Sequence, residues 1–232
     1  METIIYLVRH GETEANVTET LQGQRDVPLN ENGLSQARLI GERLRKKHFD
    51  VIRSSDLSRA RITAEAIAGE RQITFDPFLR EWDLGEWVGL KWSQIAEKYP
   101  GEAAAFKKGT MDSPVPGGES RREFYSRAER VLKELIVSFP GKEILCVSHG
   151  GLLRAMLNVA AKGQLSISIR TDNTCFCCLK YLHNSESWQM VFWNDTSHLE
   201  GQKLSNGWLN KSHSTQGEDT LWKRKSNSAL WA

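Results

Sequence analysis

The sequence predicts an α/β protein whose mostly parallel sheet is covered by helices on both faces. Short apolar runs rich in β-branched residues alternate with longer segments whose apolar residues recur every three or four positions. This alternation is typical of strands that are joined by crossover helices and pair in parallel. A late pair of apolar runs, joined by the polar residues 183–186, predicts instead an antiparallel hairpin near one edge of the sheet.

The predicted strands are short, and the early ones end at polar residues. The first, residues 3–8 (TIIYLV), runs into Arg9 and His10, and the second ends at Ser54 and Ser55. We expect strands at 3–8, 49–52, 143–148, 174–182 and 187–193.

The predicted helices carry recognisable start signals. Asn30 is a good N-cap residue, and Ser120 with Glu123 three positions later forms a capping box. The segment between residues 76 and 118 is less regular and holds two short helices. We expect helices after Asn30, at 57–68, 92–98 and 101–108, from Ser120 to Phe139, and from Gly150 to Ala160.

Composition argues against several classes of partner. The 232 residues include 31 Lys and Arg against 29 Asp and Glu, so net charge gives no reason to expect a nucleic-acid partner. No stretch has the roughly 18–20 apolar residues of a membrane span, so we expect no membrane partner. The first residues, METIIYLVRHG, lack the features of a signal peptide, and three of the four cysteines crowd into one predicted strand, residues 174–182. We therefore expect a cytoplasmic protein with reduced, buried cysteines.

The domain organisation changes near residue 200. Residues 1–200 carry the alternating pattern of one α/β domain, whereas residues 201–232 are rich in Ser, Asn, Gln and Lys and poor in aliphatic residues. That tail nevertheless holds Trp208, Trp222 and Trp231. We expect a tail that is disordered or docked on the domain.

Charged and imidazole side chains follow three of the predicted strands. Arg9 and His10 follow the first strand, and His149 follows the strand at 143–148 and precedes a helix. Arg59 lies in the first turn of the helix after the second strand. Because ligands in open α/β sheets bind at the carboxyl ends of the strands, these four side chains are expected to converge. Gly150, which follows His149, would let the backbone approach a ligand.

Two arginines and two histidines together suit a phosphoryl group. The planar guanidinium fork matches its equatorial oxygens, one histidine can carry the phosphoryl group, and the other can donate a hydrogen bond. The sequence shows no metal-binding carboxylate cluster and no Walker motif. We therefore expect neither a metal nor a cofactor, with side chains supplying the positive charge.

Four segments in this order, LVRHGETEAN, SSDLSRARITAE, LREWDLGEWVG and VSHGG, resemble the histidine phosphatase superfamily in its phosphoglycerate mutase-like branch. The resemblance covers roughly residues 1–200. It implies a three-layer α/β sandwich and a phosphohistidine intermediate. It also implies that His10 is the nucleophile and that Glu81 is the proton donor to the leaving oxygen; among the neighbouring carboxylates, Glu86 is our second choice for the acid. The other implied residues are Arg9, Arg59 and His149 around the phosphoryl group, and Asn16, Gln22 and Gly23 for substrate binding, to which the residue pattern adds Gly150.

Phosphatase and mutase members of this family share the same five catalytic residues. The short interval between Glu81 and His149 and the segment Pro116–Ser120 (PGGES) resemble phosphatase-type members. We therefore expect hydrolysis of a small phosphorylated metabolite, with phosphoglycerate mutase as the alternative. A phospho-ligand-binding module with weak catalysis is a second alternative. The sequence does not indicate the oligomeric state.

Overall fold

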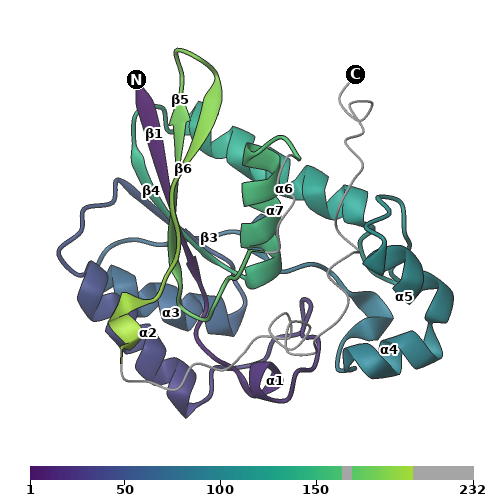
Figure 1. Cartoon of the computed structure of the whole chain (residues 1–232). Helices are drawn as coiled ribbons and strands as arrows, with labels where there is room; N and C mark the ends of the chain where they lie inside the picture. Colours follow the sequence, from purple (N-terminus) through teal and green to yellow (C-terminus); the bar gives the residue numbers. More distant parts are fainter. Residues whose placement is uncertain (164–168, 201–232) are drawn as a thin grey trace.

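A computed structural model describes residues 1–163 and 169–200, and it confirms the three-layer α/β prediction (Figure 1). One mixed sheet has the strand order β3-β2-β4-β1-β5-β6. The expectations for the tail, residues 201–232, lie outside the described residues. The strands are β1 (Glu2–Arg9), β2 (Val51–Ser54), β3 (Thr74–Phe75), β4 (Glu143–Ser148), β5 (Phe176–Leu182) and β6 (Ser187–Asp195).

The sheet is parallel over β3, β2, β4 and β1 and antiparallel beyond β1. β5 and β6 form the expected antiparallel hairpin at one edge. The sequence did not predict β3, because it has only two residues, both exposed. β5 begins two residues later than expected because Thr174 has a φ of 51° and the N–H of Cys175 donates to the carbonyl of Asp172 in a turn.

The helices confirm the predicted caps. The Asn30 side chain accepts from the N–H of Gly33 at 2.8 Å, and Ser120 and Glu123 cap each other reciprocally. The helices are α1 (Glu14–Val17), α2 (Glu31–Leu44), α3 (Ser58–Ala68), α4 (Trp92–Lys98), α5 (Pro100–Lys107), α6 (Arg121–Ser138) and α7 (Gly150–Ala160), with 3₁₀ turns at Pro77–Leu79, Gly85–Trp87 and Ser197–Leu199.

Two helical layers cover the sheet. Figure 1 shows α2 and α3 on one side and α6 and α7 on the other. β1 alternates between them: Ile5 and Leu7 belong to the core under α6 and α7, whereas Tyr6 and Val8 belong to the core under α2 and α3. β5 divides its cysteines in the same way, with Cys177 in the first core and Cys178 in the second.

Residues 76–118 form an excursion held by aromatic contacts. The Trp87 ring lies edge-on to the rings of Trp92 and Phe106, and Trp82 stacks on Phe124 of α6 with ring centroids 4.4 Å apart. These contacts fix the loop between β3 and α4 against α6. Across the described residues, no helix is both long enough and apolar enough to span a membrane.

Candidate active site

The carboxyl ends of β2, β4 and β1 lie side by side, and the predicted histidines follow two of them. Arg9 pairs in register with Ser148, and the next residue, His10, donates its N–H to the Ser148 carbonyl at 2.9 Å. The rings of His10 and His149 lie with centroids 5.1 Å apart. The structure therefore brings together the two histidines that the sequence predicted would converge.

His10 is buried and held in one orientation. Its Nδ1 donates to the carbonyl of Gly11 at 2.6 Å, which leaves Nε2 as the nitrogen with a free lone pair. Burial lowers the pKa of His10 well below its usual value, and the nearby charges of Arg59 and Arg9 lower it further. His10 is therefore neutral near pH 7, the protonation state that a nucleophile needs.

The two predicted arginines are oriented by main-chain carbonyls. Arg59 is only 1% exposed and donates to the carbonyls of Arg25 at 2.8 Å and Gly23 at 2.9 Å. Arg9 donates to the carbonyl of Thr171 at 2.6 Å. Burial lowers the pKa of Arg59 to about 10, so it remains charged at neutral pH. Because carbonyls carry no net charge, these contacts leave both positive charges available to an anion.

His149 is held by a serine that the sequence analysis gave no role. Ser55 Oγ accepts from the N–H of Leu57 at 3.3 Å and lies 2.8 Å from His149 Nε2. We assign the serine proton to the bond with Nε2, which places the imidazole proton on Nδ1. Burial lowers the pKa of His149 well below its usual value, and the nearby charge of Arg59 lowers it further. His149 is thus a neutral donor, and its Nδ1 is buried without a hydrogen-bond partner among the described residues.

Glu81 contacts the first turn of the helix that follows His149. Its Oε2 accepts from the N–H of Gly151 at 2.9 Å, and its Oε1 accepts from the N–H of Trp82 at the same distance. The nearby Glu81 partly offsets the lowering of the Arg9 and Arg59 pKa values by burial. Glu86, the second candidate, is exposed and accepts from the Tyr99 hydroxyl at 2.7 Å. The geometry therefore favours Glu81 over Glu86 as the acid.

The four predicted substrate-binding residues occupy different settings. Asn16 Oδ1 accepts from the N–H of Thr13 at 3.1 Å in the cap of α1, and Oε1 of Gln22 is buried without a partner among the described residues. Gly23 adopts a φ of +49° and presents its carbonyl to Arg59. Gly150 begins α7, and a Cβ there would lie 3.2 Å from Arg9 Nε, so glycine allows Arg9 to approach.

Two further side chains support the backbone around His10, and the sequence analysis missed both. Asn173 donates to the carbonyl of His10 at 3.1 Å, and Thr63 Oγ1 accepts from the N–H of Gly11 at 3.1 Å. Thr63 lies four residues after Arg59 on one helix face, a spacing that could have indicated it. Nothing in the sequence around Asn173 predicts its contact with His10.

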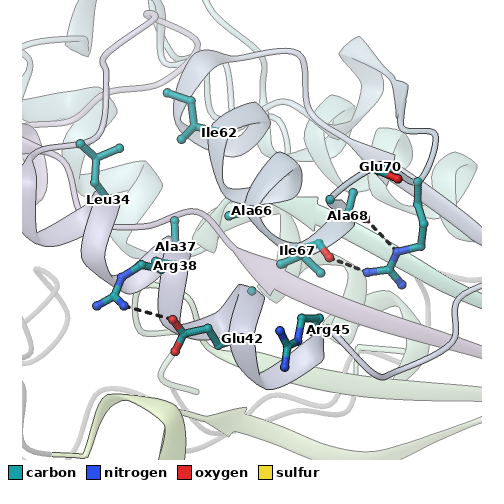
Figure 2. Close-up of a pocket in the computed structure, with 13 residues that line it drawn as sticks. Leu34, Ala37, Arg38, Glu42, Arg45, Ile62, Ala66, Ile67, Ala68 and Glu70 are labelled. Atoms are coloured by element: carbon teal, nitrogen blue, oxygen red, sulfur yellow. Dashed lines mark hydrogen bonds and ion pairs between the residues drawn. The ribbon is translucent and has the colours of Figure 1, made fainter.

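The described residues offer no group of three or more His, Cys, Asp or Glu side chains arranged to hold a metal ion. A groove of about 520 Å³ lies elsewhere, between α2 and α3 (Figure 2). Its lining combines apolar residues such as Leu34 and Ile62 with charged residues such as Arg38 and Glu42, and none of the predicted site residues borders it.

The chain also matches a known protein family. Residues 5–196 match the model of the histidine phosphatase superfamily (branch 1). The chain therefore belongs to the histidine phosphatase superfamily, in its phosphoglycerate mutase-like branch.

Some of the relatives are named phosphatases and others are named mutases. A probable phosphoglycerate mutase from Salmonella choleraesuis is 35% identical over 212 residues, which cover 86% of this chain and 96% of that protein. The structure is similar to that of an Entamoeba histolytica phosphoserine phosphatase mutant in complex with phosphoserine, with a TM-score of 0.75, 27% identity and coverage of 85% and 99%. It is also similar to a mycobacterial glucosyl-3-phosphoglycerate phosphatase, with a TM-score of 0.73, 30% identity and coverage of 84% and 100%.

Proposed function

We propose that this protein is a metal-independent hydrolase of small phosphomonoesters that works through a phosphohistidine at His10. One observation carries the proposal: Arg9 Nε, Arg59 Nε and His149 Nδ1 are buried near His10 without a hydrogen-bond partner among the described residues. A buried polar group left unpaired costs about 1–3 kcal/mol. The three oxygens of a phosphoryl group would pair all three donors beside the nucleophile.

In the first step, the lone pair of His10 Nε2 attacks phosphorus and forms a P–N bond. The bond between phosphorus and the ester oxygen breaks, and that oxygen takes the proton of the Glu81 carboxyl group, so the product leaves as a neutral alcohol. Arg9, Arg59 and His149 donate to the equatorial oxygens, where negative charge is concentrated in the transition state. Because His10 is already neutral, no proton has to leave it before attack.

In the second step, water attacks the phosphohistidine. The Glu81 carboxylate takes one proton from the water, the oxygen of the water bonds to phosphorus, and the P–N bond breaks. Phosphate leaves, and both His10 and Glu81 return to their starting states. One acid–base residue thus serves both half-reactions, as microscopic reversibility requires.

The choice of hydrolysis over transfer depends on the fate of the phosphohistidine. The two solved structures named above are phosphatases of phosphoserine and of glucosyl-3-phosphoglycerate, which supports hydrolysis of small phosphorylated metabolites. The Salmonella relative is named a probable phosphoglycerate mutase, which supports phosphoglycerate mutase as the second candidate.

Released phosphate measured in the presence of a chelator tests the proposal. The substrates are a panel of phosphomonoesters, with conversion of 3-phosphoglycerate to 2-phosphoglycerate followed in a parallel assay. His10→Ala is expected to abolish both reactions, whereas His48→Ala, a change at an exposed histidine, serves as the matched control. Isomerisation faster than phosphate release would favour the mutase, and release that survives His10→Ala would contradict the mechanism.

A further inference from the structure

Arg127 of α6 uses its whole guanidinium group to hold the loop that carries Glu81. Its Nη1 donates to the carbonyls of Phe78 at 2.9 Å and Arg80 at 2.7 Å, and its Nη2 donates to the carbonyl of Glu81 at 3.0 Å. Its Nε and Nη2 also donate to the two carboxylate oxygens of Glu119, at 2.8 and 2.7 Å. The Arg127 side chain is only 10% exposed, so these bonds are partly shielded from water.

Glu119 extends the same network to the other side of the acid. Its Oε2 accepts from the N–H of Asp83 at 3.0 Å, and its own N–H donates to the Asp83 carbonyl at 2.9 Å. Its carbonyl accepts from the Trp82 indole at 2.8 Å. The preceding Gly118 permits this close approach, because a Cβ there would lie 2.4 Å from the Asp83 carbonyl oxygen.

Main-chain groups on both sides of Glu81 are therefore bonded by one ion pair, and the Gln24 side chain adds a second donor to the Glu81 carbonyl at 3.2 Å. Residues 80–84 have no regular secondary structure, so no helix or strand determines where the Glu81 backbone lies. The Glu81 carboxylate reaches the N–H of Gly151 at 2.9 Å only while this backbone stays in place. A misplacement of a catalytic group by about 1 Å can cost about 10²-fold in rate.

From these contacts we infer that Arg127 and Glu119 are positioning residues for the acid. The ion pair sets the distance of the Glu81 carboxyl group from the leaving oxygen without touching the substrate. The inference rests on the proposed function, because it takes Glu81 to be the acid. It also gives a physical role to the glutamate of the PGGES segment, whose carboxylate anchors Arg127. Lysine could not replace Arg127, because one ammonium cannot reach three carbonyls and two carboxylate oxygens in a fixed plane.

The test uses the dependence of rate on the leaving group. An alkyl ester needs the acid because an alkoxide leaves poorly, whereas p-nitrophenolate leaves readily without a proton. The rate of the first phosphoryl transfer to His10 is measured by rapid quench for the best alkyl ester of the panel and for p-nitrophenyl phosphate. The variants are Arg127→Met, Arg127→Lys and Glu119→Gln, with Glu81→Gln as reference. Arg122→Met is the matched control, since Arg122 lies on the same helix and pairs with the exposed Asp112.

If the inference is correct, Arg127→Met slows transfer from the alkyl ester by about 10–100-fold and transfer from p-nitrophenyl phosphate by less than about threefold. Arg127→Lys does not restore the alkyl rate, Glu119→Gln gives a smaller loss in the same direction, and Arg122→Met leaves both rates unchanged. If Arg127→Met fails to fold, Arg127→Lys and Glu119→Gln test the inference by the same comparison, the loss of rate on the alkyl ester against the loss on p-nitrophenyl phosphate.

Two results would overturn the inference in distinguishable ways. In the first, Arg127→Met slows transfer from both esters equally, or from neither, while Glu81→Gln still slows only transfer from the alkyl ester. This result would show that the Arg127–Glu119 pair supports only the fold. In the second, Glu81→Gln slows transfer from both esters equally or from neither. This result would show that Glu81 is not the acid, so the ion pair would have no acid to position.

Discussion

Replacing Gly151 with alanine should separate catalysis from stability. Gly151 is the second residue of α7, and a Cβ at this position would lie 2.1 Å from Oε1 and 2.9 Å from Cδ of Glu81. The colliding atoms are the end of a flexible side chain, so the Glu81 carboxylate moves and the helix stays. To reach ordinary contact distance, 3.4 Å or more, Oε1 must move by at least about 1.3 Å, which is enough to cost about 10²-fold in rate.

The same substitution should not reduce the free energy of unfolding. Alanine is a better helix former than glycine by about 0.8–1.0 kcal/mol in a helix interior, and by less in a first turn. We therefore expect Gly151→Ala to unfold at the wild-type temperature or above, while kcat for an alkyl phosphomonoester falls by about 10²-fold. The assays are thermal unfolding and steady-state phosphate release on the same preparation.

A matched control is available in α5. Gly101 is also a helical glycine, and a Cβ there would meet nothing within 4 Å, so Gly101→Ala should keep full activity. Full activity in Gly151→Ala would refute the placement of Glu81 in the catalytic step. A lowered unfolding temperature in Gly151→Ala would show that the backbone, and not the carboxylate, gives way.

Three other predictions follow from the environments of single groups. Ser55→Ala removes the group that fixes the proton of His149, so kcat, measured by phosphate release, should fall about tenfold or more, and the buried Nε2 left without its partner should lower the unfolding temperature, measured by calorimetry. The folded-state pKa values of His10 and His149 lie below the unfolded value of about 6.5, so the unfolded state binds more protons in acid. The free energy of unfolding should therefore fall as the pH drops below about 6.5, and urea titrations at pH 7 and 5 that gave equal values would contradict this. Burial raises the pKa of Cys146 to about 12 and that of Cys178 to about 11, so a thiol reagent should label them only after denaturation.

The sequence predicted best those features that depend on neighbouring residues. His10 and His149 could be placed together because each directly follows an apolar strand, and parallel strands end at the same edge of a sheet. Asn30 and Ser120 mark helix starts because a cap bonds residues only three positions away.

Long-range support of the site could not be predicted in this way. Arg127 bonds the carbonyl of Glu81 from 46 residues further along the chain, and Asn173 bonds the carbonyl of His10 from 163 residues away. Such contacts depend on how the layers pack against each other, and no pattern of neighbouring residues indicates them. Glu81 itself stood among several carboxylates in the sequence, and family resemblance, more than residue pattern, singled it out.

The central claim is that His10 carries the phosphoryl group, and trapping the intermediate tests it most directly. The protein is mixed with an excess of a hydrolysed phosphomonoester in the presence of a chelator and quenched in alkali, where a P–N bond survives. Peptide mass spectrometry then locates the phosphate. We predict a phosphohistidine at His10 that forms at least as fast as phosphate is released. Turnover with no phosphate on His10, or with phosphate on another residue, would contradict the account.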